Sequence, residues 1–233
     1  MTTDMEPKPD GMELIALPQE KALQHLLGAL NWTYERVMDG IPGMDGVEDF
    51  ANSYRASAQS TENAIDSLVR WQIGKASMAG FVMNLGGVVT LPIAVPANLF
   101  GALYVQTQMV AAIAHLRGYD VRSDKVRTLV IGCLIGDQLV ETLKLAGITV
   151  GKKLAGQAIN RISGAALTKI NQAIGMRLLT KAGMTGVFNL GKLVPLVGGV
   201  IGGTIDGVMT TGIATVAKRL FVAIDAMPEH DQD

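Results

Sequence analysis

The stretch from Ala76 to Leu116 contains no Asp, Glu, Lys or Arg. Such a segment has to be buried in a protein or in lipid, and about 20 apolar residues are enough to cross a membrane. Pro92 and Pro96 interrupt the stretch, and proline is unfavourable inside a helix and restricts the residue before it. The pattern therefore predicts an apolar helical hairpin, with helices near 76–90 and 97–116.

The second of these helices carries Asn98, Gln106, Gln108 and His115. Polar side chains are unfavourable against lipid, where water cannot bond them. We therefore expect this helix to be buried in protein. An alternative is that the hairpin, with its proline-rich apex, dips into one leaflet of a bilayer.

A second apolar segment, from Leu193 to Phe221, contains glycines four residues apart. Residues at this spacing share one face of a helix, and a face without side chains lets another backbone approach closely. Because each glycine costs about 1 kcal/mol of helix propensity relative to alanine, close packing has to compensate. We predict a central glycine-rich helix. The expected packing positions are Gly198, Gly199, Gly202, Gly203 and Gly207.

Asp206 lies within this glycine-rich run. A buried carboxylate is unfavourable unless it is paired or hydrogen-bonded, which leaves two hypotheses. In the structural one, Asp206 accepts hydrogen bonds from a helix N-terminus or from Arg161, Arg177 or Lys181. In the functional one, it is a ligand or proton site in an apolar cavity.

The charges are segregated along the chain. Residues 1–75 hold twelve acidic and six basic residues, whereas residues 142–205 hold no acidic residue. This segregation indicates an anionic partner for the central region, unless the acidic N-terminal part folds over it. The candidate lipid- or anion-binding residues are Lys144, Lys152, Lys153, Arg161, Lys169, Arg177, Lys181 and Lys192.

The fold class follows from helical periodicity, which begins near Pro18, and from the lack of sustained two-residue alternation. We predict an all-α multi-helix bundle, with a disordered tail over 1–11, a single helical domain over 12–225 and an acidic tail over 226–233. Ser123 is a candidate N-cap. Further helices are expected near 47–73, 126–145, 150–162 and 164–180.

Enzyme motifs are largely missing from the sequence. Gly186, Gly191 and Lys192 have the spacing of a phosphate-binding loop, but Leu193 stands where that loop needs Ser or Thr. The histidines, at positions 25, 115 and 230, show no metal-ligand spacing. We therefore expect no metal or cofactor, and we expect the protein not to be an enzyme.

Compartment and partner class are constrained by composition. The single cysteine, Cys133, lies among aliphatic residues and rules out an intrachain disulfide, which favours a reducing compartment. The acidic N-terminus does not resemble a secretory signal. Aromatic residues, at 5%, are too few to favour base stacking. We expect a cytoplasmic protein that does not bind nucleic acid.

Two segments also match a known pattern. One, "LPIAVPANLFGALYVQTQMVAAIAHLRGYDV", is a proline-led helix that runs into a Gly-Tyr-Asp turn, and it resembles the EcsC family. The other, from residue 178 to 221, is similar to the C-terminal signature of that family. The residues that carry this signature are Pro195, Gly198, Gly199, Gly202, Gly203, Asp206, Lys218, Arg219 and Phe221.

The resemblance spans roughly residues 60–222 and implies little about mechanism. The family takes its name from the third gene of a bacterial operon that also encodes an ABC transporter, and the biochemical function of its members is unsettled. It supplies no catalytic residues. The long acidic N-terminal part of this chain departs from the family pattern.

These observations favour a protein that is peripheral at the inner membrane. It would bind an anionic lipid or an acyl ligand, or scaffold a membrane protein partner of the transporter type. One alternative is an enzyme that acts on a lipidic substrate with Asp206 as acid or base. Another is a membrane-perturbing protein that uses glycine-zipper helices.

Overall fold

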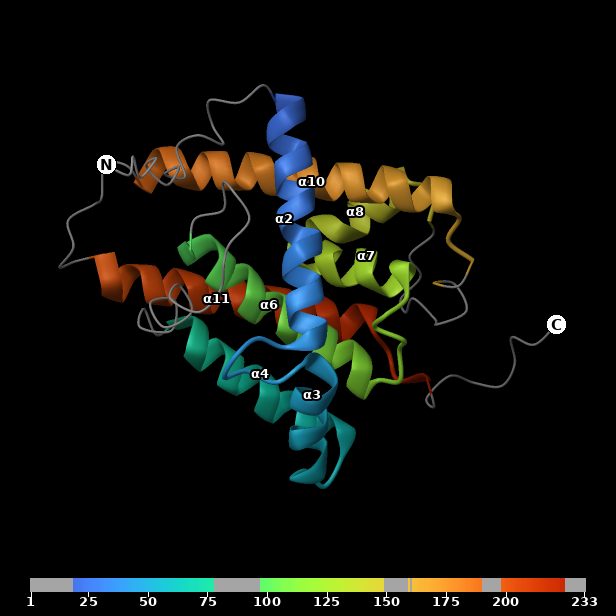
Figure 1. Cartoon of the computed structure of the whole chain (residues 1–233), viewed down its shortest axis with the longest axis vertical. Coiled ribbons are helices and arrows are strands. Elements are labelled where there is room, and N and C mark those ends of the chain that lie inside the picture. Colours follow the sequence, from blue (N-terminus) through green and yellow to red (C-terminus); the bar gives the residue numbers. More distant parts are fainter. Residues whose placement is uncertain (1–18, 78–96, 149–158, 160, 190–197, 225–233) are drawn as a thin grey trace, which may run out of the picture.

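The computed structural model describes residues 19–77, 97–148, 159, 161–189 and 198–224. In these ranges the chain forms helices joined by turns, with one isolated β-bridge between Ile41 and Met44. The predicted all-α bundle is therefore confirmed (Figure 1). The helices are α2 (Gln19–Asp39), α3 (Val47–Ala56), α4 (Thr61–Ser77), α6 (Ala97–Leu116), α7 (Asp124–Cys133), α8 (Gln138–Leu145), α10 (Gly164–Asn189) and α11 (Gly198–Leu220).

Helix α6 is the uncharged helix that the sequence predicted over 97–116. It packs against α2, α3, α4, α7 and α11, and every residue from Leu103 to Ala114 is buried. The expectation that this helix is buried in protein is confirmed. Of the helices that the structure describes, none has the length and hydrophobicity that a membrane crossing requires. The first helix of the predicted hairpin lies mostly outside the described residues.

Polar residues on α6 meet polar partners on neighbouring helices. Gln72 of α4 donates from Nε2 to Gln108 Oε1 at 3.1 Å, and Gln108 Nε2 donates to the carbonyl of Asp45 at 3.3 Å. On another side of α6, Gln106 Nε2 donates to Thr210 Oγ1 of α11 at 3.4 Å. Because buried amides are unfavourable without partners, these bonds fix the positions of α4 and α11 along α6.

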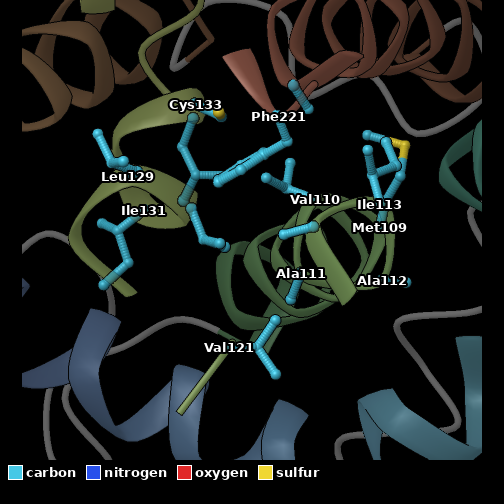
Figure 2. Packing of buried hydrophobic residues seen from close by; sticks show 14 of the residues in the cluster. Met109, Val110, Ala111, Ala112, Ile113, Val121, Leu129, Ile131, Cys133 and Phe221 are labelled. Atoms are coloured by element: carbon cyan, nitrogen blue, oxygen red, sulfur yellow. The ribbon is translucent and has the colours of Figure 1, made fainter. Parts of the chain in front are cut away.

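The hydrophobic core extends from α6 to α7 and to the end of α11. Figure 2 shows Phe221 lying between Val110 of α6 and Cys133 of α7. Phe221 also makes an edge contact with the Tyr119 ring, with centroids 5.1 Å apart. The Tyr119 hydroxyl donates to the carbonyl of Val222 at 2.8 Å. Residues 221–224 are thereby held against the turn that follows α6.

Two predicted helices are each divided in the structure. The helix expected over 47–73 breaks between α3 and α4, where the Ser60 hydroxyl accepts a hydrogen bond from the Asn63 amide and starts a new helix. The helix expected over 126–145 breaks between α7 and α8, where Gly136 has a φ of +66°. Local capping and turn residues therefore override a continuous hydrophobic pattern.

The remaining helix predictions have mixed outcomes. Ser123 caps α7, because its side chain accepts a hydrogen bond from the Val126 amide. The helix predicted over 164–180 continues as α10 to Asn189. The helix predicted over 150–162 and the two predicted tails lie almost wholly outside the described residues.

Helix α2 packs closely on α10 at a glycine that the sequence analysis did not single out. In Figure 1, α2 crosses α10 at a steep angle. A Cβ atom on Gly175 would lie 2.5 Å from Leu23 Cδ1 and 2.9 Å from Leu27 Cδ2. The missing side chain at Gly175 is what allows the two leucines of α2 to reach α10.

We expect Gly175→Val to lower the free energy of unfolding by about 1–3 kcal/mol, since overpacking forces neighbouring side chains from their positions. Gly212→Val is the matched control. A Cβ atom on Gly212, also inside a helix, would meet nothing within 4 Å, so this change should be neutral or slightly stabilising. Urea denaturation of both variants measures the difference, and equal stabilities would contradict the close α2–α10 contact.

Candidate functional site

Several acidic residues of the N-terminal helices pair with bases that lie far away in the sequence. Glu35 pairs with Arg127, Glu48 with Arg122, Glu62 with Arg117 and Asp66 with Lys218. In the part of the chain that the structure describes, these acids thus meet bases outside the 142–192 region. The hydrogen bond from Lys218 holds the pKa of the Asp66 carboxyl below its usual value.

The described candidate bases lie in or near α8 and α10, which pack against each other. Lys144, Arg161 and Lys169 are exposed, and none of the three forms an ion pair with another described residue. Arg177 differs, because it donates to Gln138 Oε1 at 3.1 Å and to Glu141 Oε2 at 3.2 Å. Its charge is therefore partly neutralised within the protein.

The other four candidate bases cannot be placed in the same way. Lys181 belongs to α10, but its side chain lies outside the described part of the structure. Lys152, Lys153 and Lys192 lie in segments that the structure does not describe. Lys144, Arg161 and Lys169 are therefore the candidate bases with described, exposed side chains, and the basic face proposed below consists of these three.

Two exposed apolar residues lie on α8, the helix that carries Lys144, and neither is among the predicted site residues. Leu139, Thr142 and Leu143 form the buried side of α8. Val140 and Leu145 fall outside that side, with relative exposures of 40% and 76%. The signal was present in "QLVETLKL": Leu139 and Leu143 are four residues apart and share one side of a helix, whereas Leu145, two residues after Leu143, falls on the opposite side.

The predicted glycine-rich helix exists as α11, and it contains all five packing glycines and Asp206. It packs against α4, α6 and α7, and Gly207 is buried. The side chains of 198–206 lie outside the described part, so both hypotheses for Asp206 stay predictions. Arg177, one of the partners predicted for Asp206, pairs with Glu141.

Other reactive groups offer no second site among the described residues. Cys133 is fully buried, and burial raises the pKa of its thiol, which disfavours the reactive thiolate. Cys133 is thus a small residue of the hydrophobic core. In the described ranges, no group of His, Cys, Asp and Glu side chains could hold a metal ion.

Two buried tyrosines have contrasting surroundings. The Tyr34 hydroxyl donates to the carbonyl of Val121 at 2.6 Å. The Tyr104 hydroxyl has no hydrogen-bond partner among the described residues, and burial raises the pKa of Tyr104 to about 12. Among the described residues, the Tyr34 hydroxyl therefore contributes a hydrogen bond to the fold and the Tyr104 hydroxyl does not.

Comparison with family models, with characterised proteins and with solved structures gives no match to this chain. The resemblance to the EcsC family therefore stays a prediction.

We expect Arg117→Ala to lower the free energy of unfolding by about 2–3 kcal/mol. The Arg117 side chain is only 9% exposed. It bonds both Glu62 and the carbonyl of Phe221 at 2.8 and 2.9 Å, and charged hydrogen bonds of this kind are stronger than neutral ones. Arg122→Ala is the control, because its side chain is 60% exposed and surface pairs contribute at most about 1 kcal/mol. Thermal unfolding compares them; equal losses would contradict the anchoring role of Arg117.

We also expect Tyr34→Phe and Tyr104→Phe to change the free energy of unfolding by different amounts, or in opposite directions. The first change leaves the buried Val121 carbonyl without its donor and should lower stability by about 1–2 kcal/mol. The second removes a buried hydroxyl that has no described partner, so stability should stay constant or rise. Chemical denaturation of the two variants gives the comparison, and a larger loss for Tyr104→Phe would show that its hydroxyl is bonded in solution.

Proposed function

We propose that this chain is a non-enzymatic protein that associates peripherally with the cytoplasmic face of a membrane by binding anionic lipid head groups. The observation that supports this proposal most directly is the difference between two sets of bases. Arg117, Arg122 and Arg127 are paired with acids of the N-terminal helices. Lys144 and Lys169 stand exposed on adjoining helices without such partners.

Unpaired bases on one face attract anionic surfaces. Each Lys or Arg near an anionic membrane contributes about 1 kcal/mol, and the attraction falls off within a Debye length of about 10 Å at 0.1 M salt. Three such bases give an association that is weak, reversible and sensitive to salt. Because all three side chains are already exposed, the protein needs no rearrangement to bring them to a surface.

The proposal predicts that the protein sediments with vesicles containing phosphatidylglycerol and stays in the supernatant with phosphatidylcholine vesicles. Raising the salt from 0.05 to 0.5 M, values chosen to bracket a Debye length of about 10 Å, should release it. Replacing Lys144, Arg161 and Lys169 together by Gln should lower the apparent affinity at least about tenfold, from the contribution of each base near the membrane.

The matched control replaces Lys21, Arg70 and Arg219 together by Gln, because these three bases are also exposed and carry the same total charge, but lie on α2, α4 and α11. It should bind vesicles like the unmodified protein. Equal recovery in the supernatant with both kinds of vesicle would contradict the proposal. An equal effect of the two triple replacements would show that net charge, rather than this face, decides binding.

A further inference from the structure

We infer that the C-terminal end of α8 is the part of the surface that enters the lipid, with Leu145 as the inserting side chain. This inference rests on the proposed membrane association and names the contact through which it occurs. It also assigns an apolar contribution to binding, which head-group attraction alone does not supply.

The geometry of α8 separates a buried side from a lipid-facing one. Leu139 and Leu143 are fully buried and hold the helix on the protein. Leu145, two residues after Leu143, has 76% of its surface exposed, the largest value among the exposed large hydrophobic residues that are described. The adjacent Lys144 is exposed as well. Helix α8 therefore presents a leucine and a lysine side by side at its C-terminal end.

This pair suits the interface of an anionic bilayer. A leucine gains free energy when it leaves water for the acyl region, while a lysine can extend its ammonium group to the head groups and leave its aliphatic part in apolar surroundings.

The charges around α8 also allow its C-terminal end to approach an anionic surface. Glu141 lies one helical turn before Leu145, on the same side of α8, and its side chain is 67% exposed; its carboxylate is paired with Arg177 at 3.2 Å and is therefore partly neutralised. Asp137 lies at the opposite end of the helix, at its N-cap position. No acidic residue follows Leu145 in the sequence until Asp206. An anionic surface therefore meets little repulsion at the C-terminal end of α8.

Another exposed apolar residue provides the contrast. Val208 on α11 has a relative exposure of 74%, almost equal to that of Leu145. However, it lies in a stretch of α11, residues 207–217, that contains no base. Exposure alone would make the two positions equivalent, whereas the charge around them distinguishes them.

The test places an environment-sensitive fluorophore, NBD, at either position through Leu145→Cys or Val208→Cys. The native Cys133 is fully buried and should not react, so the unmodified protein serves as the labelling blank. With phosphatidylglycerol vesicles, we expect a blue shift and quenching by doxyl-labelled acyl chains at position 145 and neither effect at position 208. Sedimentation of the same samples reports binding independently of the probe.

The outcomes separate the inference from the proposed function. If the protein sediments with the vesicles but the probe at 145 does not respond, or both probes respond equally, insertion through α8 is wrong and membrane association stands. If the labelled proteins do not sediment with anionic vesicles, the proposed function is wrong, and the inference is overturned with it.

A second variant tests the apolar contribution without a probe. Leu145→Asn should lower vesicle affinity about tenfold, the effect expected for losing part of a leucine's transfer free energy. Its melting temperature should equal that of the unmodified protein, because the side chain is mostly exposed. Val208→Asn is the matched control and should bind normally. Unchanged affinity of Leu145→Asn would overturn the inserting role of this leucine.

Discussion

The burial of α6 is the interaction on which the rest of the bundle depends. This uncharged helix packs against α2, α3, α4, α7 and α11, so that the other segments are arranged around it. Its apolar residues gain free energy by leaving water. Its buried amide side chains fix where the neighbouring helices lie along it. Gln108 is bonded to Gln72 of α4, and Gln106 is bonded to Thr210 of α11. Hydrophobic burial therefore drives the assembly, and the amides select the alignment of the helices.

The ion pairs have a different consequence, since they decide which bases are left for a partner. Four of the N-terminal acids, Glu35, Glu48, Glu62 and Asp66, are paired with Arg127, Arg122, Arg117 and Lys218. A chain with a net charge close to zero can then still present a basic face around α8 and α10. The proposed membrane contact follows from this distribution rather than from net charge.

Several features of the candidate site could not be predicted from the sequence. One continuous helix was predicted over 126–145, whereas the structure separates α7 from α8 by a turn in which Gly136 has a φ of +66°. Gly175 is similar, because only the approach of Leu23 and Leu27 from another helix shows why no side chain fits there.

The sequence by itself determined that the chain is all-α, that the segment over 97–116 is buried, and that acids and bases are segregated. Periodicity, the absence of charge and composition are local properties, and they suffice for these conclusions. Only the tertiary structure decided which acid meets which base and which apolar residue stays exposed. Those outcomes depend on contacts such as the ion pair between Glu62 and Arg117. Such contacts join residues far apart in the chain, so the local sequence pattern cannot predict them.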